Sequence, residues 1–249
     1  MTKTQKKIVG LTAAIALALG TLPAAGAMHI MEGYLPGGMC LLWGAVCLPF
    51  LAYGFFSIKK TLARDRRAIT LLAMAGAFIF VISSLKIPSV TASCSHMTGT
   101  GLGAILFGPS AVSILGIIVL IFQAILLAHG GLTSLGANTF SMAIAGPFVS
   151  FGIYKLCQKL KINKLVGVFL AASLGDLFTY CVTAIQLATA HPSPEGGVAL
   201  AAVKFLGVFA PTQVPLAILE GILTVVIVIA LESYARPELK AIGFEKEAV

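Results

Sequence analysis

The stretch Thr100-Gly-Leu-Gly-Ala-Ile-Leu-Phe-Gly-Pro109 determines how often this chain crosses a membrane. It is apolar, but it is far shorter than the about 20 residues that a helix needs to span a bilayer. It lies among longer apolar stretches, which we place near 37–57, 68–86, 111–128, 139–157, 165–189 and 213–233. Whether the short stretch is a further crossing or part of a loop changes which loops share one side of the membrane.

The composition indicates a membrane protein. The 249 residues are 58% hydrophobic and only 10% charged, whereas a soluble domain carries about 25% charged residues. So much hydrophobicity also excludes a disordered chain, and no basic segment interleaved with aromatic residues supports a nucleic-acid partner. The 26 glycines suit closely packed transmembrane helices. We therefore predict an all-α membrane protein.

Residues 1–27 have the pattern of a cleavable signal peptide. An apolar run over 8–22 follows three basic residues and precedes the small residues Ala25-Gly-Ala27; the basic residues are Lys3, Lys6 and Lys7. This order of segments is typical of secretory signals. An uncleaved signal anchor is the alternative. Cleavage after Ala27 would make Met28 the new amino terminus, on the outer face of the membrane.

Basic residues gather in three places, which predicts the topology. These are Lys59, Lys60, Arg64, Arg66 and Arg67; Lys155, Lys159, Lys161 and Lys164; and Arg236, Lys240 and Lys246. The positive-inside rule places all three groups in the cytoplasm. With Met28 outside, the chain must then cross an odd number of times between Gly99 and Lys155. The stretch 100–109 is therefore predicted to cross, sheltered by its neighbours, giving about seven transmembrane helices with the carboxyl terminus inside.

The four histidines are predicted to lie on the outer side: His29, His96, His129 and His191. Cleavage would expose Met28-His29, whose terminal amine, His29 amide nitrogen and His29 ring nitrogen can close two adjacent chelate rings. Nitrogen donors in one plane suit Ni(II) or Cu(II), and they can hold Co(II). The glycine-rich loop that carries His96 makes this residue the candidate for the fourth position.

Two alternatives remain at this stage. A zinc site could use Cys94, His96 and His29, because thiolate and imidazole suit tetrahedral zinc. A membrane enzyme would instead need Asp176 and Glu220, both inside apolar spans, to meet in a cavity. For Asp176 we favour a hydrogen bond between helices over a proton relay.

Three motifs point to a known family: Met28-His-Ile-Met-Glu-Gly-Tyr-Leu-Pro36, Ser93-Cys-Ser-His96 with the glycine-rich stretch from Thr98 to Pro109, and Leu132-Thr-Ser-Leu-Gly-Ala-Asn-Thr-Phe-Ser-Met142. They resemble the CbiM/NikM family, the substrate-binding membrane subunits of cobalt and nickel energy-coupling-factor transporters. The resemblance covers essentially the whole chain after Ala27. One departure is Met97, where we expect proline to be common.

The resemblance implies a signal peptide over 1–27 and one integral membrane metal-binding domain over 28–249, folded as the helical bundle of these S components. The metal ligands would be the amine of Met28, the amide and ring of His29, and the ring of His96. The function would be capture of Co(II) for cobalamin biosynthesis in the cell membrane of a prokaryote. Ni(II) uptake by the same mechanism, or a metal sensor or structural protein without transport, is the alternative.

The chain carries no phosphate-binding G-x-x-x-x-G-K-[ST] loop and no hydrolase motif in a plausible context, so we predict no catalytic residues and no enzyme activity. ATP hydrolysis would need separate ATPase subunits and an energy-coupling transmembrane subunit, with a small accessory membrane subunit as a further partner. The metal ion is cargo, and no cofactor is predicted. Because the His29 amide must lose a proton, metal binding should weaken as the pH falls.

Overall fold

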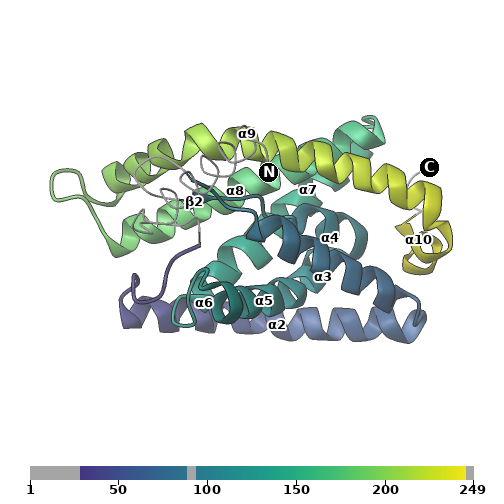
Figure 1. The fold of residues 1–249 in the computed structure, drawn as a ribbon, viewed down its shortest axis with the longest axis horizontal. Coiled ribbons are helices and arrows are strands. Elements are labelled where there is room, and N and C mark those ends of the chain that lie inside the picture. The colour runs from purple at the N-terminus through teal and green to yellow at the C-terminus, as the bar shows by residue number, and fades with distance from the viewer. Residues whose placement is uncertain (1–28, 89–93, 245–249) are drawn as a thin grey trace, which may run out of the picture.

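The chain folds into a bundle of helices that run along the long axis of the molecule (Figure 1). The computed structural model describes residues 29–88 and 94–244. The elements in chain order are α2 (Gly37–Arg64), α3 (Ala68–Ser84), β1 (Ile87–Pro88), β2 (Cys94–Ser95), α4 (Thr100–Phe107), α5 (Pro109–Leu127), α6 (Leu135–Asn138), the π-helix η2 (Thr139–Ala145), α7 (Gly146–Lys159), α8 (Lys164–Ala190), α9 (Gly197–Tyr234) and α10 (Arg236–Ile242). Apart from the short antiparallel pair β1–β2, the regular secondary structure of the described residues is helical, so the predicted all-α class is confirmed.

Within residues 29–88 and 94–244, five helical stretches are long and apolar enough to cross a membrane: α2, α5, the continuous run 135–159, α8 and α9. The predicted spans near 68–86 and 100–109 correspond to the shorter helices α3 and α4. At 1.5 Å per residue, the eight-residue α4 is only about 12 Å long and cannot cross a hydrocarbon core of about 30 Å by itself. The count of seven crossings therefore stays a prediction.

The short helix α4 is enclosed by its neighbours, as predicted. Every residue of 100–106 is buried. At Gly101 the contact with α8 is so close that an added Cβ would lie 2.9 Å from the Cα of Ala172. A side chain at this position would separate the two backbones. Close approach through small residues is the usual way in which membrane helices pack.

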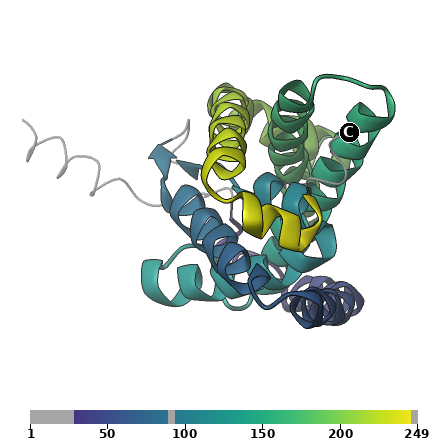
Figure 2. The same cartoon turned by 90° about the vertical axis from the view of Figure 1, so that its right-hand side faces the viewer.

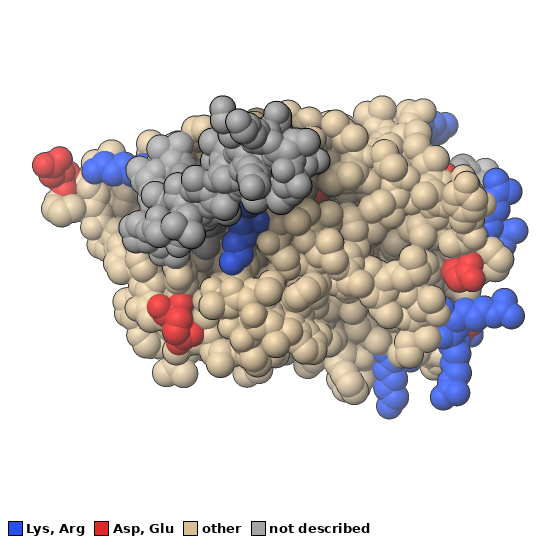
Figure 3. Space-filling model, in the orientation of Figure 1, with Lys and Arg blue, Asp and Glu red and all other residues tan. Residues whose placement is uncertain are grey.

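The outer surface has the character of a lipid-facing surface. Along α2 only Cys47 and Gly54 are buried, while Leu41, Leu48 and Phe55 are exposed by 78%, 64% and 59%. Figure 3 shows uncharged residues over the middle of the molecule and charged residues mainly towards its two ends. Apolar surface on this scale is not stable in water, so the chain is a multi-pass membrane protein.

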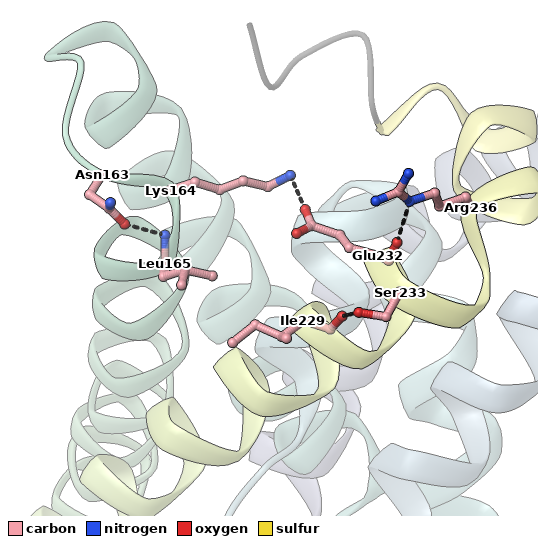
Figure 4. A network of polar contacts seen from close by, with 7 residues as sticks. All are labelled: Asn163, Lys164, Leu165, Ile229, Glu232, Ser233 and Arg236. Atoms are coloured by element: carbon pink, nitrogen blue, oxygen red, sulfur yellow. Dashed lines mark hydrogen bonds and ion pairs between the residues drawn. The ribbon is translucent and has the colours of Figure 1, made fainter.

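The described segments that carry the three basic groups come together at one end of the bundle (Figure 1). Lys246 lies outside the described residues. Lys164, at the start of α8, forms an ion pair with Glu232 near the end of α9, and its ammonium group lies 4.5 Å from the centre of the Phe244 ring. The same Glu232 accepts a hydrogen bond at its carbonyl from Nε of Arg236 (Figure 4). Helix α10 lies across this end of the bundle (Figure 2) and packs on α3. This grouping agrees with the prediction that the three basic groups share one side of the membrane.

The contact at Gly101 generates a stability prediction. Gly101→Ala should lower the free energy of unfolding in detergent by about 1–3 kcal/mol, because an overpacked contact forces the two helices apart. Thermal unfolding of the purified protein measures this. Gly152→Ala in α7 is the matched control, since no atom lies within 4 Å of its added Cβ. Equal melting temperatures for the two variants would contradict the proposed tight packing of α4 on α8.

Candidate metal centre

The segment that carries His29 is held against α6 and the loop that precedes it. The amide of Ile30 donates to Oδ1 of Asn138 over 2.8 Å, and Nδ2 of Asn138 donates back to the Ile30 carbonyl over 3.0 Å. The amide of Thr133 donates to the carboxylate of Glu32 over 3.1 Å. Gly131 is required here, because an added Cβ would lie 2.5 Å from Glu32. These contacts fix the position of His29 before α2 begins.

His96 lies in an extended segment that α9 holds in place. The amides of Thr98 and Gly99 donate to the carboxylate of Glu220 over 2.6 and 3.0 Å. Nε2 of Gln213 donates both to the carbonyl of His96 and to Oδ2 of Asp176, over 3.1 and 2.6 Å. The bond from Gln213 to Asp176 links α9 to α8, which is the interhelical role predicted for Asp176.

His129 is placed by the end of α5. The helix terminates at Ala128 with φ +46°, and Gly130 has φ +78°. The amide of His129 donates to the carbonyl of Gln123 over 3.1 Å. This sharp turn directs His129 back into the bundle instead of away from it.

Three histidine side chains converge at this place. Nδ1 of His29 lies 2.7 Å from Nε2 of His96 and 2.8 Å from Nε2 of His129. All three side chains are buried, with 3%, 0% and 2% of their surface exposed. Within the described part of the chain they form a group whose ligand atoms lie within 4.8 Å of one another.

The rings of His29 and His96 each make one hydrogen bond outside the cluster. These bonds determine which nitrogen of each ring has a free lone pair inside the cluster. Nδ1 of His96 lies 2.9 Å from the carbonyl of Met97, and Nε2 of His29 lies 3.2 Å from the sulfur of Met142 in η2. A carbonyl and a thioether only accept hydrogen bonds, so these two nitrogens carry the protons. Nε2 of His96 and Nδ1 of His29 therefore face each other as lone pairs, an arrangement that a cation stabilises.

The distances agree with shared coordination of one ion. Imidazole nitrogens bind zinc at about 2.0–2.1 Å, and similar bonds at right angles place adjacent nitrogens about 2.8–3.0 Å apart. The two observed separations, 2.7 and 2.8 Å, are close to that range. The spacing of His29 from each of its two neighbours therefore fits two adjacent ligands on one first-row transition-metal ion.

Burial keeps these imidazoles neutral. It lowers the pKa of His29 well below its usual value, and the neighbouring His129 and His96 lower it further. Burial and then His96 lower the pKa of His129 to about 2. Neutral imidazole is the form that binds metal ions. The pKa values thus favour ligand chemistry over acid–base chemistry at neutral pH.

The structure brings together two of the three predicted site residues. His29 and His96 are adjacent, whereas Met28 and the signal segment 1–27 lie outside the described residues. The side chain of Cys94, on which the zinc alternative depends, lies outside the described part as well. His191 is not in the cluster; its Nε2 lies 2.9 Å from the carbonyl of Tyr34 at an exposed position.

Sequence reasoning placed His129 on the outer side but did not choose it as a site residue. The available signal was its position directly after an apolar span and directly before Gly130-Gly131. Such a glycine pair allows a sharp turn and close packing of another segment. That signal indicates a turn, but it does not show that the turn points His129 inward.

Fold and site together define a multi-pass helical membrane protein with a buried imidazole cluster suited to a transition-metal ion. Residues 29–239 match the family described as "Cobalt uptake substrate-specific transmembrane region". The chain belongs to this family, which consists of membrane metal-transport components and not of enzymes. The resemblance identified from the sequence motifs is confirmed.

Individual relatives agree with this assignment. The chain is 75% identical to "Cobalt transport protein CbiM" of Lachnoclostridium phytofermentans over 98% of this chain and 97% of that protein. It is 61% identical to the protein of the same name from Chlorobium limicola, over 91% and 90%. A solved structure titled "Crystal Structure of an Truncated Transition metal Transporter" matches with a TM-score of 0.73 and 29% identity, over 83% of this chain and 99% of that one.

The lowered histidine pKa values predict that the metal-free protein loses stability as the pH falls below about 6.5. In the unfolded chain these imidazoles take up protons, while in the folded chain they stay neutral, so acid favours unfolding. For His129 the loss continues towards its folded pKa of about 2, at up to about 1.4 kcal/mol per pH unit. Melting temperatures between pH 7 and pH 5 measure the effect.

His129→Gln should show a shallower decrease than the unsubstituted protein, because one of the buried imidazoles is gone. His191→Ala, which removes an exposed histidine outside the cluster, should follow the unsubstituted protein. If melting temperature fell equally with pH in His129→Gln and in the unsubstituted protein, the pKa of His129 would not be lowered by folding.

Proposed function

We propose that this chain captures Co(II) at the outer face of a prokaryotic cell membrane, as the substrate-binding subunit of an ATP-driven energy-coupling-factor importer. The metal is held by the amine of Met28, the amide and ring nitrogens of His29, and the ring of His96. The observation that carries this proposal is the 2.7 Å separation between Nδ1 of His29 and Nε2 of His96, which are both buried. His29 directly follows the expected amino terminus. The relatives named as cobalt transport proteins support cobalt as the cargo.

The orientation of the His29 ring supports the proposed chelate by the Met28 amine and the His29 amide and ring. Only Nδ1 of His29 can close a six-membered ring with the amide nitrogen of the same residue, and Nδ1 is the atom that faces His96. The amine of a mature Met28 would close the adjacent five-membered ring through that same amide. His96 then occupies the position next to Nδ1. Such a nitrogen set also suits Ni(II), which is the alternative cargo.

The distribution of charge supports the orientation. The end of the bundle that carries the basic groups faces the cytoplasm under the positive-inside rule, which places the histidine cluster towards the outside. The chain has no phosphate-binding loop of its own. Transport therefore depends on separate ATPase subunits, an energy-coupling transmembrane subunit and a small accessory membrane subunit. Cobalt taken up in this way would supply cobalamin biosynthesis.

Metal binding by the purified protein tests the proposed site. His29→Ala and His96→Ala should each lower Co(II) affinity by at least about tenfold, since even residues that only orient a ligand contribute 10–100-fold. Equilibrium competition with a chromophoric chelator measures this. His191→Ala is the matched control, because it removes a histidine of the same predicted outer side that lies outside the cluster.

Amino-terminal sequencing of the same preparation belongs to this test. A start at Met28 is expected, since a longer terminus would replace the primary amine with an amide. Full Co(II) affinity in the His29→Ala variant, or in a preparation that starts at another residue, would overturn the proposed ligand set.

A further inference from the structure

We propose that a cavity at the basic end of the bundle binds the phosphate headgroup of an anionic phospholipid from the inner leaflet of the membrane. The cavity has a volume of about 190 Å³. It is lined by the end of α4 over 105–108, by Phe151 of α7, and by 242–244, where α10 ends. It thus lies at the opposite end of α4 from His96. The inference takes from the proposed function only that the basic end faces the cytoplasm.

Two lysines hold their ammonium groups over aromatic rings that line this cavity. Nζ of Lys155 lies 5.3 Å from the centre of the Phe151 ring, and Nζ of Lys164 lies 4.5 Å from the centre of the Phe244 ring. Contact with the face of an aromatic ring attracts a cation. The rings therefore help to hold both charges at the edge of the cavity.

A guanidinium group approaches the cavity from a third direction. Gly243 lines the cavity, and a Cβ added there would lie 3.8 Å from Nη1 of Arg64, in the last turn of α2. Cations from α2, α7 and α8 therefore border one cavity. Basic pockets between membrane helices on the cytoplasmic side are typical binding sites for anionic lipid headgroups.

The local balance of charge favours an anion in the cavity. The segments 59–67, 155–164 and 232–240 together carry eleven basic and three acidic residues. One of the acids, Glu232, forms an ion pair with Lys164, and the carboxyl end of α4 adds a partial negative charge of about half a unit. These two contributions offset only about half of the charge of the three bordering cations. A phosphodiester, which carries one negative charge, fits the remainder.

The size and the apolar walls of the cavity favour a lipid over a free anion. The cavity is smaller than the pockets of about 300–1,000 Å³ that enclose drug-sized ligands, so it suits a headgroup whose acyl chains stay outside. On α7, which contributes Phe151, the side chains of Phe148 and Leu156 are 42% and 54% exposed. Acyl chains that lie along this helix bury apolar surface, which adds to the affinity. A free phosphate ion gains nothing from these contacts.

The test uses the purified protein in detergent, with a short-chain phosphatidylglycerol as the probe and phosphatidylcholine of the same chain length as the comparison. Native mass spectrometry should retain phosphatidylglycerol preferentially, and only this lipid should raise the melting temperature. Equal retention of the two lipids would overturn the proposal. Inorganic phosphate is the second comparison, because an equal rise in melting temperature with phosphate would show that the cavity binds a free anion and not a lipid.

A pair of substitutions tests whether the lipid binds at this cavity. Arg64→Gln together with Lys155→Gln should lower the affinity for phosphatidylglycerol by about tenfold or more, since each basic residue close to an anionic lipid contributes severalfold. Lys59→Gln together with Lys60→Gln is the matched control. It removes the same charge from exposed positions of α2 that do not line the cavity, and it should change the affinity much less. Equal losses in the two pairs would show general attraction to a basic surface and overturn the proposal.

Two further outcomes keep the hypotheses apart. If the Arg64 and Lys155 variant does not fold, the comparison of the two lipids on the unsubstituted protein still decides whether an anionic lipid is preferred. Co(II) affinity should be the same in both pairs of substitutions, because neither pair lies at the histidine cluster. A lack of Co(II) binding by the unsubstituted protein would refute the proposed function, whereas it would leave the lipid result standing.

Discussion

A backbone amide at membrane depth must have a partner within the protein, and the extended segment before α4 is where this constraint acts most strongly. The chain is not helical at Thr98 and Gly99, so their amides lack the partners that a helix supplies. The carboxylate of Glu220 accepts both. Glu220 comes from α9, more than 120 residues later in the sequence. This contact allows the chain to enter the bundle in extended form and then begin the short helix α4.

The same contact determines where His96 lies. Because the loop is tied to α9 through Glu220 and Gln213, His96 takes its position from α9. His29 takes its position from Asn138 at the end of α6, and His129 from the end of α5. The π-helix η2 follows α6 and contributes Met142, whose sulfur lies against the His29 ring. Such π-helical stretches are frequent at functional sites. The cluster therefore joins elements that are separate in the sequence.

The features that could be predicted from the sequence were those encoded by local pattern. Apolar length identified the helices, and charge positions predicted that the short stretch 100–109 crosses the membrane sheltered by its neighbours. Its enclosure is confirmed, and the crossing stays a prediction. The pairing of His29 with His96 followed from the chelating chemistry of the expected terminus and from the glycines around His96. The β1–β2 pair was not predicted, because two residues per strand leave no periodic signal.

The long-range partners were beyond this kind of reasoning. An acid inside an apolar span indicates that it has a role, but not that Glu220 contacts the amides at 98 and 99. Likewise, His129 becomes a site residue only through the left-handed turn at Ala128 and the packing of the His29 segment on Gly131. Both depend on how α5, α6 and α9 pack together. Single-sequence patterns do not contain that information.

The arrangement also constrains how a bound ion leaves. The three imidazoles are buried and come from different elements, so an ion bound between them would leave only after at least one ring moved. His96 is fixed to α9, whereas His129 is fixed to α5, and a displacement of one helix relative to the other separates the two rings. Helix α9 contains Pro211 and Pro215 on either side of Gln213, and each proline removes a backbone hydrogen bond of the helix. The helix that holds His96 therefore lacks two backbone hydrogen bonds close to Gln213, the residue that binds the His96 carbonyl.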